Sequence, residues 1–162
     1  MITITATDDG EGALTATQTF TIVVTPVNDA PVAVADIAIV SEDAATTSID
    51  VIANDTDVDL GDTLTLTAVS TSGTGTVSIN SDGVSVDYTP SADFNGTEVI
   101  TYTVSDGTLT DETGTLTVTV TPVNDAPTIT STAVTEATED IAYTYTITTE
   151  DVDGDLVTVS AT

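Results

Sequence analysis

The heptapeptide Thr-Pro-Val-Asn-Asp-Ala-Pro occurs twice in the chain, at residues 25–31 and again at residues 121–127, with starts 96 residues apart. Similarity at a fixed period is typical of chains built from repeated domains that are joined by short linkers. The repeat therefore predicts one complete module at residues 31–126. Residues 1–30 are expected to be the C-terminal strands of a preceding module, and residues 127–162 the N-terminal strands of a following module.

Apolar side chains alternate with threonine just before each heptapeptide, as at Leu116, Val118 and Val120. A period of two is typical of a strand with one buried and one wet face, and no stretch shows a helical period. Short turn sequences such as Ser81-Asp82-Gly83 separate the alternating runs. Within the complete module, strands are predicted at residues 32–40, 48–52, 64–70, 75–79, 84–88, 99–105 and 113–121.

Seven short strands in about a hundred residues indicate an all-β fold, namely a Greek-key β-sandwich of immunoglobulin type. Tyr102 stands early in the sixth predicted strand. It is a candidate for a tyrosine corner, in which the hydroxyl bonds to backbone a few residues upstream.

The charge of the chain is unusually one-sided, with 27 acidic side chains, no lysine, arginine or histidine, and a net charge of −27. Nucleic acid and anionic membranes are bound through basic side chains, so both are excluded as direct partners. Such charge opposes compaction, yet 40% of the residues are hydrophobic, unlike in disordered acidic chains. A folded protein whose charge is offset by bound cations is therefore expected.

The residues that usually activate a nucleophile are also missing, because the chain has no histidine, cysteine or lysine. Only a pair of carboxylates could perform catalysis, and no pair stands apart from the acidic clusters. The sequence therefore predicts that the protein is not an enzyme.

Two acidic clusters, at residues 54–62 and 150–155, follow equivalent strands in successive modules. Their oxygen-only chemistry suits Ca²⁺, whereas Zn²⁺ would favour histidine or cysteine. An EF-hand is excluded, because its sixth and twelfth positions would be Leu60 and Leu66. Solvated loops are the alternative, but the recurrence of the clusters favours calcium. The carboxylates at alternating positions, which can converge on one point, are Asp55, Asp57 and Asp59 in the first cluster and Asp151, Asp153 and Asp155 in the second.

Other acids have less distinctive contexts. Glu42 and Glu139 each precede a predicted strand and are each followed by aspartate, which suits a ligand or an exposed residue. Asn28-Asp29 and Asn124-Asp125 also suit a turn, and Asp8 and Asp106 fit a turn or a ligand equally well. Asp82 is expected to be a turn residue. Solvent-facing positions are predicted for Asp36, Asp50, Asp87, Asp93 and Asp111.

The segment Ala6-Thr7-Asp8-Asp9-Gly10, followed by a strand and Val27-Asn28-Asp29-Ala30-Pro31, resembles the end of a cadherin-type repeat. The Asp-Val-Asp-Gly-Asp run at residues 151–155 resembles the loop that faces such a linker. Nearly the whole chain is similar to the bacterial cadherin-like and Ig-like tandem repeats of large surface adhesins of the RTX and VCBS type. Pro26 and Ala30 depart from the cadherin linker, which implies fewer ions at each junction.

The resemblance implies that calcium sits where modules meet. One junction would gather Asn28, Asp29, Asp55, Asp57 and Asp106, with Asp59 as an optional ligand. The next would gather Asn124, Asp125, Asp151 and Asp153, with Asp155 as an optional ligand.

The expected function is that of a calcium-rigidified extender of an extracellular, cell-surface adhesin that supports adhesion or biofilm formation, with neighbouring modules as its partners. The alternatives are a polysaccharide-binding module, and a filament subunit in which the terminal part-modules of two chains complete each other by strand exchange.

Overall fold

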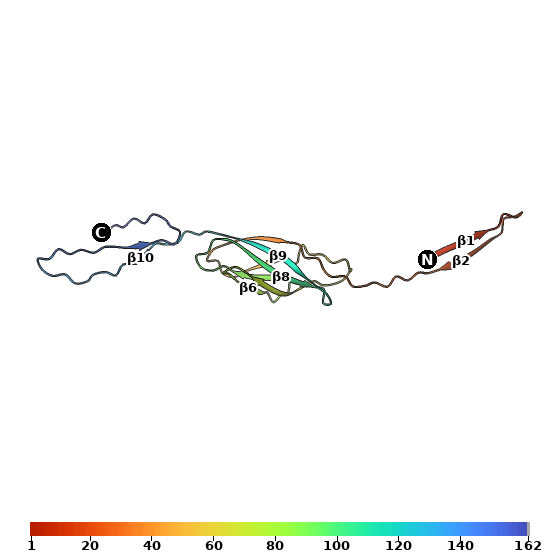
Figure 1. Cartoon of the computed structure of the whole chain (residues 1–162), viewed down its shortest axis with the longest axis horizontal. Coiled ribbons are helices and arrows are strands. Elements are labelled where there is room, and N and C mark those ends of the chain that lie inside the picture. The colour runs from red at the N-terminus through yellow and green to blue at the C-terminus, as the bar shows by residue number, and fades with distance from the viewer. Residues whose placement is uncertain (162) are drawn as a thin grey trace.

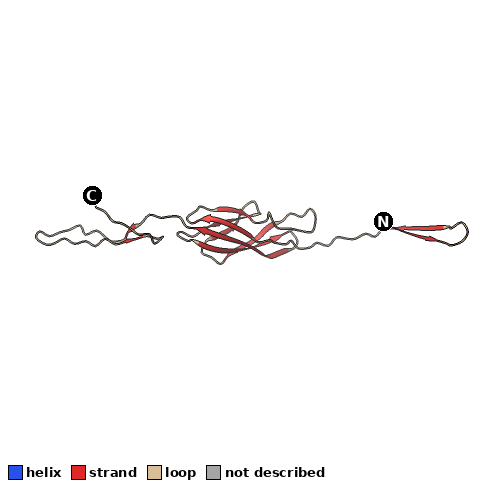
Figure 2. Cartoon of the chain, turned by 90° about the horizontal axis from the view of Figure 1, so that it is seen from above, coloured by secondary structure: helices blue, strands red, loops and turns tan. Residues whose placement is uncertain are grey.

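The structure, a computed structural model, describes residues 1–161 except for the side chains of residues 111–113. In this part of the chain, all regular structure is β-strand (Figure 2). A two-stranded hairpin, a central sandwich and an extended C-terminal segment follow one another along the long axis (Figure 1). No helix in residues 1–161 has the length and apolarity needed to cross a membrane.

The N-terminal hairpin consists of β1 (Ile2–Thr7) and β2 (Thr15–Phe20), which pair antiparallel. Its turn is held by the Asp8 carboxylate, whose Oδ1 accepts the N–H groups of Gly10 and Leu14. Both faces of the hairpin are exposed.

The central sandwich has two sheets. The four-stranded sheet has the order β3–β9–β8–β5, in which β3 and β9 are parallel and the other pairs are antiparallel. Its strands are β3 (Asp36–Ser41), β5 (Thr65–Thr71), β8 (Gly96–Ser105) and β9 (Thr110–Thr121). The three-stranded sheet has the order β4–β7–β6, formed by β4 (Thr47–Asp50), β6 (Thr76–Ile79) and β7 (Ser85–Thr89).

The core lies between these sheets and is built from alternate strand positions. Leu116 and Val118 of β9 are fully buried, while the threonines between them face outward. Tyr88 and Tyr102 are the largest fully buried side chains among the described residues. Each large apolar side chain removed from water contributes roughly 1.5–3 kcal/mol to folding, so this alternation drives closure of the sandwich.

The C-terminal segment begins as the sandwich does. Its strands β10 (Thr128–Ile129) and β11 (Thr149–Glu150) pair Thr128 with Glu150. In the sandwich, Val32 forms an isolated bridge to Thr56 at the corresponding place after the first heptapeptide. The chain thus enters both units in the same way.

The predicted all-β sandwich is confirmed, and each of the seven expected strands has a counterpart. The first one differs, because β3 begins only at Asp36. Upstream, the backbone N–H and C=O of Val32 are both bonded to Thr56, which draws this stretch towards the acidic loop instead of β9. The division into three modules remains a prediction, and Thr162 lies outside the described residues.

Candidate metal sites at the two ends of the sandwich

The linker is fixed to the unit that follows it by the same contacts at both heptapeptides. The N–H of Asp29 donates to Asp59 Oδ2 at 2.7 Å, and the N–H of Asp125 donates to Asp153 Oδ2 at 2.7 Å. In each copy the preceding asparagine side chain donates to the aspartate carbonyl at 3.1 Å. The two junctions are therefore built on one plan.

The acidic loops repeat this plan. Asp57 Oδ1 accepts the N–H of Asp59 at 2.8 Å, and Asp151 Oδ1 accepts the N–H of Asp153 at 3.1 Å. The N–H of Asp155 donates to the same oxygen of Asp151 at 3.1 Å. The pair Asp57 and Asp59 therefore corresponds to Asp151 and Asp153.

At the N-terminal end of the sandwich, three carboxylates from two loops converge. One oxygen from each of Asp57, Asp62 and Asp106 lies within 4.8 Å of the others. Asp106 Oδ2 also accepts the side-chain N–H of Asn28 from the linker at 2.7 Å. Asp106 lies in the turn between β8 and β9, Asp57 and Asp62 lie in the acidic loop, and Asn28 lies in the linker. These three segments therefore meet at one point.

The charges of this group act on each other. Desolvation, followed by repulsion from Asp57, Asp59 and Asp106, raises the pKa of Asp62. Hydrogen bonds from the N–H of Leu109 and the side chain of Asn28 lower the pKa of Asp106, which stays ionised. Asp57 Oδ2 is buried and has no hydrogen-bond partner.

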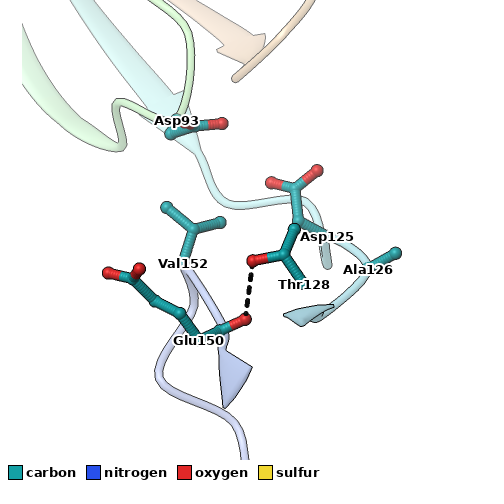
Figure 3. Close-up of a pocket in the computed structure, with 6 residues that line it drawn as sticks. All are labelled: Asp93, Asp125, Ala126, Thr128, Glu150 and Val152. Carbon is teal, nitrogen blue, oxygen red and sulfur yellow. Dashed lines mark hydrogen bonds between the residues drawn. The ribbon is translucent and has the colours of Figure 1, made fainter. Parts of the chain in front are cut away.

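At the C-terminal end, two carboxylate groups share Asp125. Glu42 and Asp153 form the first group with it, and Asp43 and Asp93 form the second; within each group one oxygen per residue lies within 4.8 Å of the others. A cavity of about 310 Å³ opens beside Asp125, between Asp93 and the residues around Glu150 (Figure 3). Among the side chains that the structure describes, this end therefore carries more converging acids than the other.

Glu42 is the most buried acid of this end, with 3% of its surface exposed. Its Oε1 accepts the N–H of Val123 at 2.6 Å, and its Oε2 accepts the side-chain N–H of Asn95 at 3.3 Å. Asp125 Oδ2 is buried and has no hydrogen-bond partner. Desolvation, followed by repulsion from surrounding acids that include Asp43 and Glu42, raises the pKa of Asp125.

Six of the predicted acidic ligands are outside these three groups, namely Asp29, Asp55, Asp59, Glu139, Asp151 and Asp155. Two of the six also make none of the junction contacts described above. Asp55 turns to the start of β3, where its Oδ1 accepts the N–H of Val34 at 2.7 Å and lies 3.3 Å from the Tyr102 hydroxyl. Glu139 is exposed in a turn of the C-terminal segment, next to Asp140 with a φ of 64°.

Three acids of the convergent groups were missed by the sequence reading. Asp93 is exposed, as predicted, but its carboxylate also belongs to the second group, and its N–H donates to Asp43 Oδ1 at 3.1 Å. Asp43 carries a sequence signal, because Glu42-Asp43 recurs as Glu139-Asp140. Asp62 belongs to the first acidic cluster, but the second cluster has no acidic residue at the corresponding position, so the repeat gave no reason to select Asp62.

Two interior predictions also need correction. Asp36, predicted to face solvent, accepts the Tyr102 hydroxyl at 3.0 Å, and burial raises its pKa. The Tyr102 hydroxyl also reaches the carbonyl of Val34, 68 residues earlier in the chain, instead of a tyrosine-corner partner just upstream. The tyrosine therefore joins β8 to the entrance of β3. The side chain of Asp111 lies outside the described residues.

Among the comparisons with known proteins, a family match over the central sandwich agrees with this architecture. No curated protein matches the chain. An endo-fucoidan hydrolase from glycoside hydrolase family 107 is a similar solved structure, with 21% identity and a TM-score of 0.39 over 79% of this chain. The chain spans only 21% of that protein. The family described as "Bacterial Ig domain" matches residues 28–121, more than half of the sequence, and the chain therefore belongs to the bacterial Ig domain family.

Proposed function

We propose that this chain is a structural spacer of an extracellular bacterial surface protein, and that Ca²⁺ bound at its junctions makes it rigid. Bacterial Ig-like domains are typically extracellular or surface-exposed, which supports the location. The observation that carries the proposal is the duplicated junction, in which Asp29 meets Asp59 and Asp125 meets Asp153 beside converging carboxylates. A large adhesin is the kind of parent protein in which such a spacer would act.

The residues at both junctions suit a hard cation. Every atom that the carboxylate side chains of these groups offer to a cation is an oxygen, the ligand atom that Ca²⁺ prefers. One buried oxygen in each group, Asp57 Oδ2 and Asp125 Oδ2, has no hydrogen-bond partner, and a buried carboxylate oxygen is costly when nothing compensates it. Because the chain has no basic side chain, an external cation is the available counter-charge. The ligands would be Asp57, Asp62 and Asp106 at one end and Glu42, Asp43, Asp93, Asp125 and Asp153 at the other.

The mechanical effect follows from where these ligands come from. At the C-terminal end, Glu42 belongs to the sandwich, Asp125 to the linker and Asp153 to the following segment. Repulsion among them favours separation of the two units when no cation is bound. A cation shared by all three would hold the sandwich, linker and next unit together, and the joint would stiffen.

The expected stabilisation is moderate for each site. Extracellular calcium modules bind with dissociation constants near 0.1 mM, so at about 1 mM Ca²⁺ one site contributes about 1.4 kcal/mol. Two or three such sites would supply a sizeable share of the stability of a domain, which is typically about 5–15 kcal/mol.

Differential scanning calorimetry and calcium titration of the full chain test the proposal. Calcium is expected to raise the melting temperature, and Asp57→Asn and Asp125→Asn should each reduce that rise. Glu11→Gln is the matched control, because it removes one charge from the exposed N-terminal hairpin and should leave the calcium response unchanged. Identical melting curves in calcium and in chelator would refute the proposal.

A further inference from the structure

The dipeptide Asn-Gly occurs once in the chain, at Asn95-Gly96, where the β7–β8 loop enters β8. The other four asparagines are followed by aspartate or serine. An asparagine before glycine is the one most prone to lose its side-chain amide, because no Cβ on the next residue keeps the backbone nitrogen away from the asparagine Cγ. The sequence therefore singles out Asn95 for this reaction.

The fold requires the glycine of this pair. Gly96 has a φ of 140°, a conformation that residues with a side chain rarely adopt. A Cβ atom at Gly96 would also lie 3.4 Å from Phe94 Cζ. A bulkier residue at position 96, which would slow the reaction, is thus disfavoured by the backbone itself.

The side chain of Asn95 is exposed and weakly held. Within the described part of the chain it makes one hydrogen bond, from its Nδ2 to Glu42 Oε2 at 3.3 Å. The amide of Asn80 is instead held at both ends, since its Nδ2 donates to Asp87 Oδ1 at 2.8 Å and its Oδ1 accepts the N–H of Asp82 at 3.0 Å. Asn95 therefore has more freedom than Asn80 to turn its Cγ towards the next backbone nitrogen.

We propose that Asn95 is a deamidation site, and that loss of its amide loosens the C-terminal joint of the sandwich. The backbone nitrogen of Gly96 bonds to Asn95 Cγ, the Cγ–Nδ2 bond breaks, and ammonia leaves with the proton of the Gly96 N–H. Water then opens the five-membered imide at either carbonyl, which leaves aspartate or isoaspartate at position 95. Opening at the end of a strand costs little free energy, and it supplies the motion that the first step needs.

The consequence follows from the position of Glu42. This side chain is 3% exposed, and its Oε1 accepts the N–H of Val123 in the linker at 2.6 Å. Deamidation replaces the donor at Glu42 Oε2 with a second negative charge. A buried carboxylate that loses a donor and gains a like charge is strongly disfavoured, so Glu42 is displaced and the Val123 N–H loses its acceptor. The linker is then less firmly tied to the sandwich.

Fragmentation mass spectrometry of the intact chain, after incubation in mildly alkaline buffer with chelator, tests the site. Asn95 should lose its amide first, at a rate no more than about tenfold below that in the urea-unfolded chain. Asn80 is the internal control and should keep its amide. An Asn95 amide that survives in the folded chain after the unfolded chain has lost it would overturn the proposal, and so would equal loss at Asn80.

Hydrogen exchange in chelator tests the consequence, and it does so independently of calcium binding. Asn95→Asp should accelerate exchange of the Val123 amide by about tenfold or more, because like charges this close repel strongly near a protein surface. Asn80→Asp is the matched control, since it makes the same amide-to-acid change beside Asp87, within the β6–β7 hairpin. It should leave Val123 exchange unchanged. Wild-type exchange of Val123 in Asn95→Asp would show that deamidation does not loosen the joint.

Discussion

Glu42 Oε1 accepts the backbone N–H of Val123 at 2.6 Å, which ties the linker to the sandwich across 81 residues of sequence. Two residues further on, the N–H of Asp125 donates to Asp153 Oδ2 in the following segment at 2.7 Å. Asn124 is thus the one residue between an amide held by the preceding unit and an amide held by the next. The linker is therefore anchored by one hydrogen bond on each side of Asn124, while the carboxylates beside it still repel one another when no cation is bound.

The Glu42 contact should control the order of the linker without calcium. Glu42→Ala leaves the Val123 amide without its acceptor and should accelerate its hydrogen exchange in chelator by about tenfold or more, because a hydrogen bond to a charged group contributes about 1.5–3 kcal/mol. Glu42→Gln is the control, since its carbonyl oxygen still accepts this N–H. Equal protection of Val123 in the wild type and Glu42→Ala would show that the bond does not hold the linker.

A second buried acid, Glu98, fixes the turn between β5 and β6. Its Oε1 accepts the N–H of Thr74 at 2.6 Å and the N–H of Gly75 at 3.1 Å, and its Oε2 accepts the Tyr88 hydroxyl at 3.0 Å. Burial acts to raise the pKa of Glu98, but these hydrogen bonds, with the one from the Thr74 hydroxyl, outweigh it and lower the pKa below 4.5.

Glu98→Gln should therefore lower the free energy of unfolding at pH 7 by about 3 kcal/mol, because an amide cannot accept all of these donors. The pKa of Glu98 is lower in the folded state, so its stabilisation is present above pH 4.5 and is lost as the pH falls through the folded value. The difference between wild type and variant should shrink in acid. Urea unfolding at several pH values measures it, and a difference that does not change with pH would contradict the assignment.

The strands could be predicted from the sequence because their signal is local. In β9, Leu116 and Val118 alternate with threonine, and this period is enough to place the buried face. Glu98 carries the same signal, because it alternates with the buried Ile100 and Tyr102 of β8. Counting along that strand would have identified it as a buried acid.

The metal groups could be predicted only in part, because their members come from separate loops. Asp43 lies in the β3–β4 turn and Asp93 in the β7–β8 loop, and only the fold brings both beside Asp125. Asp55 and Asp57 look equivalent in the sequence. In the structure, the N–H of Val34 and the hydroxyl of Tyr102 bind the Asp55 carboxylate. No pattern in the neighbouring sequence predicts that Asp55, and not Asp57, makes these contacts.

Gly114 of β9 supports the ring of Tyr102. A Cβ atom at Gly114 would overlap the ring, with Tyr102 Cζ 2.6 Å away. Gly114→Ala should therefore lower the free energy of unfolding by about 2–3 kcal/mol through overpacking. In a Tyr102→Ala background the same substitution should cost much less, and thermal unfolding of the double-mutant cycle measures the coupling.

Gly10→Ala is the control for this cycle, because the nearest side-chain atom would lie 3.6 Å from its Cβ. An equal cost of Gly114→Ala in both backgrounds would show that the ring is not the obstacle.

Alkaline titration should report the Tyr88 contact. Burial, followed by the hydrogen bond to Glu98, raises the pKa of Tyr88 to about 12. Because the pKa is raised in the folded state, the stabilisation is fully present below pH 10 and is lost as the pH rises towards 12. Tyr88→Phe should flatten the fall in unfolding free energy over this range and remove one late step from the tyrosinate absorbance. If the variant kept that late step, Tyr88 would not be the group that titrates there.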